Sequence, residues 1–312
     1  MSASLVSNFP TGFANGVEIR GIPVLNTYAG SVFWVNSTGG SDSGKGTRIR
    51  PFATLDYAIG RCTANNGDII IVAPNHAETV TGASGITFDV AGITVVGLGR
   101  GNQRPRFLMD GGTTVTAVVS AADVSLQNLV FAGGHNGIVT CFGVTGTNAK
   151  FENIEFEDNT TDEHFLVAFS ATGADNTADG LTVRGCRWVS IDAGITDFIS
   201  FTGSANNVTV SDNYMCVDAA TGAGIILCAT GKALTGLEFN RNTLICGNTS
   251  TDLLIDNDGT ANTGVAAYNL CGHHDVAAAI LIDCDGIRLF ENYSNSTDTT
   301  SGFILPAIDT DT

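Results

Sequence analysis

A short pattern repeats along the chain and limits the folds that the chain can adopt. Six positions recur in the order apolar, any, apolar, any, any, and then an apolar residue or asparagine. Clear copies start at Ile93, Val124, Ala149, Leu181, Val208, Leu237 and Ile287, and a weaker copy starts at Ala266. Their average spacing of about 28 residues lies within the range of solenoid repeats. One elongated solenoid of stacked units is therefore expected.

The hexads alternate between apolar and other residues with period two, which is typical of β-strands. A second apolar run precedes each hexad, as at 165–169 and 198–201, and glycine or Asn/Asp residues lie between the runs. Beyond residue 65 no long amphipathic helix is indicated, which excludes leucine-rich and helical repeats. Two strands per rung, over about eight or nine rungs, predict an all-β parallel β-helix. A β-sandwich or barrel is the alternative, with strands at short intervals and no fixed rung.

The sixth hexad position predicts a ladder along the solenoid. Asparagine occupies it at Asn213, Asn242 and Asn292, whereas Cys186 and Leu129 occupy it in other copies. Asparagines stacked in register can satisfy buried backbone groups at a corner. We therefore predict a partial structural ladder that comprises Cys186, Asn213, Asn242 and Asn292.

Residues 51–62 are expected to cover the first edge of the solenoid. Phe52, Leu55, Ala58, Ile59 and Cys62 fall at helical spacing, which indicates a short helix with one apolar face. The segments 33–47, 51–59 and 67–74, with their Gly-Ser-Asp, Pro-Phe-x-Thr-Leu and Gly-Asp-x-Ile motifs, resemble the opening of pectate-lyase-like β-helix proteins. This resemblance implies a right-handed, single-stranded parallel β-helix with a capping helix. It does not imply lyase chemistry.

Residues 8–25 resemble leader segments that precede β-helices or fibres in tailed-phage virion proteins. The resemblance implies an attachment arm, and its partner-binding residues are then expected to be Phe9, Phe13, Asn15, Ile19, Arg20 and Pro23. A short strand pair that packs on the rod is the alternative. The expected organisation is an arm over 1–30, an N-terminal strand and capping helix over 31–75, and the β-helix over 76–312.

Charge excludes several partners. The chain has 31 acidic against 14 basic residues, a net charge of −17, and no basic stripe that would bind nucleic acid or an anionic polysaccharide. No apolar stretch is long enough to span a membrane, and the first residues do not form a secretory signal. The eight cysteines form no CxxC pair and are expected to pack as free thiols, with disulfides as the alternative.

The sequence contains only weak motifs for catalysis or metal binding. The acidic residues Glu155, Glu157, Asp212, Glu238, Asp256 and Asp283 are more typical of a solvated outer face than of a hydrolytic pair. The signatures of polygalacturonase-like proteins are missing, and His135 within 133–137 is the nearest approach. The run 256–259 favours an Asx-rich turn over a Ca²⁺ site, and His273 and His274 would point to opposite faces of a strand. No catalytic residue, metal or cofactor is therefore predicted.

These observations lead to three functional hypotheses. The first is a structural virion protein of a tailed phage, assembled in the host cytoplasm: a homotrimeric decoration or spike, attached through its arm to the major capsid or another virion protein, with host polysaccharide as an additional partner. The second is a tailspike-type protein that binds or depolymerises polysaccharide. The third, a secreted lyase-like enzyme, is disfavoured because the signal peptide and the catalytic signatures are missing from the sequence.

Overall fold

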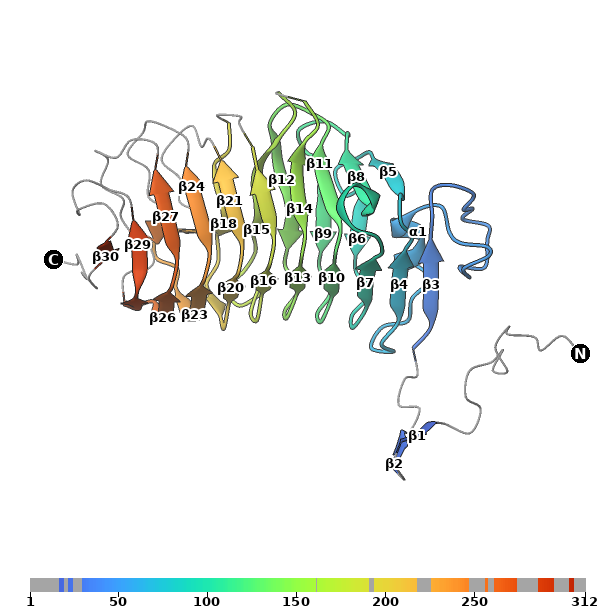
Figure 1. The fold of residues 1–312 in the computed structure, drawn as a ribbon, viewed down its shortest axis with the longest axis horizontal. Coiled ribbons are helices and arrows are strands. Elements are labelled where there is room, and N and C mark those ends of the chain that lie inside the picture. Colours follow the sequence, from blue (N-terminus) through green and yellow to red (C-terminus); the bar gives the residue numbers. More distant parts are fainter. Residues whose placement is uncertain are drawn as a thin grey trace, which may run out of the picture.

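A computed structural model describes residues 17–19, 22–24, 30–160, 162–190, 194–217, 226–246, 256–257, 261–273, 286–294 and 303–305. Within these residues the chain winds into a rod of stacked turns whose strands run across the long axis (Figure 1). Every pairing between successive turns is parallel. The protein is thus an all-β parallel solenoid.

Three sheets run along the rod. Sheet 1 contains β3 (Val32–Val35), β4 (Ile69–Val72), β7 (Thr94–Gly97), β10 (Ser125–Gln127), β13 (Lys150–Glu152), β16 (Thr182–Arg184), β20 (Thr209–Ser211), β23 (Leu234–Asn240), β26 (Thr263–Ala267) and β28 (Ile287–Phe290), with β19 (Ala205–Asn206) beside β23. Sheet 2 contains β5 (Ala77–Val80), β8 (Arg106–Met109), β11 (Val130–Gly133), β14 (Glu155–Asp158), β17 (Arg187–Val189), β21 (Tyr214–Val217), β24 (Thr243–Cys246), β27 (Leu270–His273), β29 (Asn292–Ser294) and the antiparallel β30 (Phe303–Leu305). Sheet 3 contains β6 (Ile86–Phe88), β9 (Ala117–Val119), β12 (Ile138–Val144), β15 (Phe165–Ala171), β18 (Asp197–Phe201), β22 (Ile226–Cys228) and β25 (Asp256–Asn257).

The prediction of two strands per rung is wrong, because each of seven turns has a strand in all three sheets. The hexads form sheet 1, and the apolar runs before them form sheet 3. Sheet 2 was missed because its strands follow the hexads after a corner of only two residues. At that corner Asn128, Asn153 and Asp212 adopt positive φ angles of 58°, 54° and 60°, which turn the chain from sheet 1 into sheet 2.

The interior is one continuous apolar core. Stacking in register repeats the same side chain in neighbouring turns, so Phe131 pairs with Phe107 and Phe142 pairs with Phe169. The rings of these two pairs are stacked, with centroids 5.2 and 5.5 Å apart. Aromatic contacts of this kind add to the stabilisation from buried area.

One short helix, α1 (Leu55–Ile59), lies near the first turn, and a 3₁₀ turn, η1 (Gly101–Gln103), follows β7. The helix has five residues and is shorter than the segment 51–62 that was expected to be helical. Leu55, Ala58 and Ile59 are buried, and the helix contacts β3, β4 and β6.

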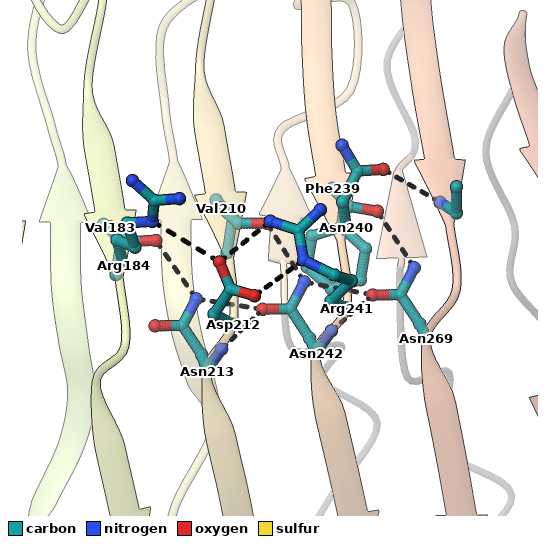
Figure 2. Close-up of polar contacts among 11 residues, drawn as sticks. Val183, Arg184, Val210, Asp212, Asn213, Phe239, Asn240, Arg241, Asn242 and Asn269 are labelled. Atoms are coloured by element: carbon teal, nitrogen blue, oxygen red, sulfur yellow. Dashed lines mark hydrogen bonds and ion pairs between the residues drawn. The ribbon is translucent and has the colours of Figure 1, made fainter.

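The ladder residues lie at the corner between sheets 1 and 2 (Figure 2). The Oδ1 atoms of Asn213, Asn242 and Asn292 accept backbone N–H groups of the preceding turn, from Cys186, Asn213 and Asn269 respectively. Asn269, which was not predicted, fills the gap: its Oδ1 accepts the backbone N–H of Asn242 at 2.9 Å. The repeat copy assigned to start at Ala266 is therefore misplaced, because Ala266 pairs with Phe239, the third residue of its hexad.

Candidate functional site

A groove on the outer face of sheet 3 is lined mostly by hydroxyl-bearing residues. It has a volume of about 370 Å³ and spans successive turns of the solenoid. Its lining comprises Ala83, Thr113, Thr114, Thr116, Val139, Thr140, Gly143, Ser170 and Thr172. A cavity of this size fits a small ligand or one segment of a longer one.

Strand alternation creates the groove. In β12 and β15 the large residues Phe142 and Phe169 point into the core, so their neighbours Gly143 and Ser170 lie on the outer face. The loop before β9 contributes three threonines, and the Thr116 hydroxyl donates a hydrogen bond to the carbonyl of Thr140 at 2.5 Å. This hydrogen bond joins the loop before β9 to β12.

The chemistry of the lining is neutral. Five threonines and one serine supply hydroxyls that both donate and accept hydrogen bonds, while their methyl groups and Val139 supply apolar contact. No charged side chain is among the lining residues. Such a surface suits an uncharged polyol and provides no acid–base pair of its own.

A cluster of polar side chains, buried except for the half-buried Asp158, lies where sheet 2 passes into sheet 3, between β14 and β15 and between β17 and β18. The Ser190 hydroxyl donates a hydrogen bond to Asp158 Oδ2 at 2.5 Å. His164 and Asp197 are also buried, with exposures of 3% and 6%. All four residues have further interactions with the chain. Sequence reasoning missed this cluster, although Asp197 at the start of an apolar strand was a visible irregularity.

Three of the six acidic residues singled out from the sequence form ion pairs with arginines of the described chain: Glu155, Glu157 and Asp212. Glu155 accepts hydrogen bonds from Arg104 and Arg187, at 2.6 and 3.0 Å. Glu157 pairs with Arg106 at 3.3 Å. These carboxylates lie on the outer face of sheet 2 and form ion pairs there. Burial lowers the pKa of Arg104, and the neighbouring Glu155 opposes that shift.

Asp212 belongs to the corner shown in Figure 2. Arg241 donates to both of its carboxylate oxygens, at 2.7 and 2.9 Å, and Arg184 donates a longer bond of 3.4 Å. The hydrogen bonds from Arg241 are the main reason why the pKa of Asp212 is lowered to about 2. A group held ionised in this way cannot act as a general acid near neutral pH.

The remaining candidates are spread over several places. Glu238 is exposed on β23, and Asp256 lies in β25, whereas Asp283 lies outside the described residues. His135 is exposed in the turn after β11, where its Nδ1 lies 3.0 Å from the carbonyl oxygen of Asn136. Cys271 is buried in β27 and His273 ends that strand, while His274 and Asp275 lie outside the described residues.

The described residues include free cysteine thiols, but neither a metal-binding group of side chains nor a membrane-spanning helix is found among them. Cys62, Cys141, Cys186, Cys216 and Cys271 are free thiols. Within the described part of the chain no group of His, Cys, Asp and Glu residues is arranged to hold a metal ion. None of the helices described there has the length and hydropathy needed to cross a membrane.

The proposed arm is mostly undescribed. Phe9, Phe13, Asn15 and Arg20 lie outside the described residues. Ile19 ends β1 (Val17–Ile19) and Pro23 lies in β2 (Ile22–Val24), and these two strands pair antiparallel with each other.

Comparison with known proteins shows the fold and no closer relationship. No family model matches the chain, and no curated protein matches it in sequence. Two crystal structures of GH136 lacto-N-biosidase from Eubacterium ramulus, a selenomethionine derivative and the native protein, match with TM-scores of 0.52 and 0.50 at 13% identity. A rhamnogalacturonan lyase matches with a TM-score of 0.48 at 16% identity, over 85% of this chain and 74% of that one.

The GH136 matches cover 85% of this chain but only 56% of the enzyme, so the chain spans little more than half the length of that relative. At such low identity the similarity concerns architecture alone. The chain shares a parallel β-helix fold with these GH136 structures.

Proposed function

We propose that the chain is a glycan-binding β-helix of a tailed-phage virion, and that it binds uncharged saccharide units in the groove on sheet 3. The observation that carries the glycan assignment is the lining of that groove. Its hydroxyls can exchange hydrogen bonds with sugar hydroxyls, and its methyl groups can contact the ring faces. The related fold of lacto-N-biosidase, an enzyme named for action on a saccharide, supports the same class of ligand.

The virion part of the proposal rests on the sequence. The leader-like segment 8–25 supports an attachment arm over residues 1–30, with Phe9, Phe13, Asn15, Ile19, Arg20 and Pro23 at the capsid contact. In this proposal the rod is right-handed and trimeric, and α1 caps its first turn. Quantitative mass spectrometry of purified virions should find the chain in fixed stoichiometry with the capsid protein. Virions without the chain would contradict the assignment.

Glycan binding can be tested with matched variants. The double variant Thr140→Val and Thr172→Val keeps the side-chain shape but removes two hydroxyls, each worth about 1 kcal/mol as a hydrogen-bonding group. Binding on an array of neutral oligosaccharides should weaken by about thirtyfold. Thr209→Val, on the outer face of sheet 1, is the control and should bind like the parent. No binding by the parent chain to any glycan would remove the proposal.

Depolymerisation is a second candidate because two carboxylates, the half-buried Asp158 at the end of β14 and the buried Asp197 at the start of β18, lie where sheet 2 passes into sheet 3. If the cluster hydrolyses glycosidic bonds, incubation with polysaccharide should release reducing ends, and Asp197→Asn should abolish that release. Binding without release in either protein would leave the binding function alone.

A further inference from the structure

Of the thirteen described lysines and arginines, six form ion pairs with described carboxylates, and three of the other seven lie together within residues 45–50. Six cations along its length form ion pairs with carboxylates: Arg104, Arg106, Arg184, Arg187, Lys232 and Arg241. Near the first turn, Lys45, Arg48 and Arg50 are exposed and have no carboxylate partner among the described residues. Three cations and no acid within residues 45–50 stand out in a chain with a net charge of −17.

These three cations lie close in sequence to Ile49, an apolar residue at the tip of a tight turn. Thr47 and Arg50 exchange backbone hydrogen bonds of 3.2 and 3.0 Å, which leaves Arg48 and Ile49 as the two residues of the tip. Ile49 is 91% exposed, more than any other large hydrophobic residue described. A single exposed apolar residue is common on protein surfaces. Ile49 differs because a closed turn holds it in place and because both of its sequence neighbours are arginines.

The turn is held firmly against the rod. The backbone N–H of Trp34 donates to the carbonyl of Gly46 at 2.8 Å, and Phe52 N–H donates to the carbonyl of Trp34 at 2.8 Å. Gly46 has a φ of 68°, and a Cβ there would lie 2.4 Å from the Phe52 ring. The Arg48 guanidinium lies 5.7 Å from the centre of the Trp34 ring. The tip is therefore presented with little conformational freedom to lose on binding.

Residues 44–52 also protect the edge of sheet 1, but this structural role does not account for the exposed side chains at the tip of the turn. Their backbone pairs along β3, the edge strand of sheet 1, and so blunts that edge. Asp42, the nearest acid in sequence, accepts the backbone N–H groups of Ala53 and Thr54 instead of pairing with the turn. Protection of the edge requires the backbone of residues 44–52 but neither the Ile49 side chain nor the charges of Arg48 and Arg50.

We infer that the turn at residues 45–50 is a docking element that binds an acidic protein segment with an apolar side chain among its carboxylates. Ile49 packs on that apolar side chain, and Arg48 and Arg50 pair with the carboxylates on either side of it. Arginine beside a buried apolar contact is a common centre of binding energy at interfaces. Nucleic acids and anionic polysaccharides offer charge without such an apolar side chain, and a lipid surface requires a much broader apolar area.

Fluorescent peptides provide the test, with the full chain as the binding partner. The probes are synthetic peptides in which leucine or phenylalanine is flanked by Asp and Glu, and matched peptides in which Asn and Gln replace the acids. Anisotropy should show binding of the acidic peptides only, and the affinity should fall as salt is raised. Ile49→Ser and the double variant Arg48→Gln, Arg50→Gln should each weaken binding by about tenfold or more.

Matched controls lie at the other end of the rod. Leu270→Ser removes an equally large side chain that is 52% exposed, and Arg288→Gln removes an exposed cation; neither should change peptide binding. Three results overturn the inference: no acidic peptide binds, the variants bind as the parent does, or double-stranded DNA, heparin or phosphatidylglycerol vesicles bind with no effect of Ile49→Ser. Glycan binding should persist in both turn variants, so failure here is distinct from failure of the groove proposal.

Discussion

The Oδ1 atom of Asn242 accepts two hydrogen bonds from Asn213 of the preceding turn, one from its backbone N–H and one from its Nδ2, both at 3.0 Å. Both side chains are buried, with exposures of 1% and 2%. Each asparagine also donates from Nδ2 to a backbone carbonyl, that of Val210 in the case of Asn242. The ladder thus satisfies the backbone of a tight corner where water has no access.

Replacing Asn242 with leucine should destabilise the protein strongly. The substitution removes the acceptor of the buried backbone N–H of Asn213, one of the two acceptors of Asn213 Nδ2, and the side-chain donor to the carbonyl of Val210. A loss of about 3 kcal/mol or more is expected from unsatisfied groups of this kind. Urea unfolding of Asn242→Leu measures it, with Thr243→Ala on the outer face as the control. An unchanged midpoint would show that the ladder is not a stabilising element.

The stacking of hexads in sheet 1 could be predicted because period-two alternation survives in each copy. The third residues Val95, Leu126, Phe151, Val183, Val210 and Phe239 all stack in register. The pattern failed near Ala266, where the pairing of β23 with β26 shifts register. Gly264 takes the place of the first apolar residue there, and a Cβ would lie 2.2 Å from the Leu237 carbonyl oxygen. That irregularity concealed Asn269.

The groove could not be predicted from spacing. Its hydroxyl residues lie on three different turns and on loops before the strands, and polar residues in a loop carry no signal of where they meet. The docking turn was equally hidden, because exposure of Ile49 depends on the closed geometry of 47–50.

Asp212 should make stability depend on pH in a defined acidic window. Hydrogen bonds from Arg241 lower its pKa to about 2, whereas an unfolded aspartate has a pKa of about 3.9. A lowered carboxyl pKa stabilises the folded state above the unfolded value, and this contribution disappears as pH falls through the window towards the folded value. Asp212→Asn retains a residue type that tolerates the positive φ of 60°.

Unfolding midpoints between pH 5 and about 2 should therefore fall less steeply for Asp212→Asn than for the parent chain. The variant should also be less stable than the parent near neutral pH, because Arg241 loses its ionised partner. Asp89→Asn, at an exposed position, is the control. Parallel pH curves for the parent and Asp212→Asn would refute the assigned role.

The buried cysteines should resist alkylation in the folded protein. Burial raises the pKa of Cys186 and of Cys271 to about 12, and burial raises that of Cys141 well above its usual value. The reactive thiolate is therefore scarce at pH 8, in addition to being shielded. Mass spectrometry after iodoacetamide treatment should find these three residues unmodified until the chain is unfolded. Labelling at the rate of the unfolded chain would show that the core opens readily.

His76 should hold the first turn and the segment before it together. Its Nδ1 accepts the backbone N–H of Ser37 at 2.9 Å, and its Nε2 donates to Glu78 Oε2 at 3.0 Å. The same glutamate oxygen accepts the backbone N–H of Leu55 at the start of α1. One buried imidazole thus joins the loop after β3, the short helix and β5.

Removing that imidazole should loosen this end of the rod locally rather than unfold the whole solenoid, because each turn contacts only its neighbours. In His76→Ala, hydrogen exchange at the amides of Ser37 and Leu55 should accelerate by at least about tenfold, while amides of β13 to β15 keep their protection. Glu78→Gln retains an oxygen acceptor and should have a smaller effect. Uniform acceleration along the rod would instead indicate that the solenoid unfolds as a single cooperative unit.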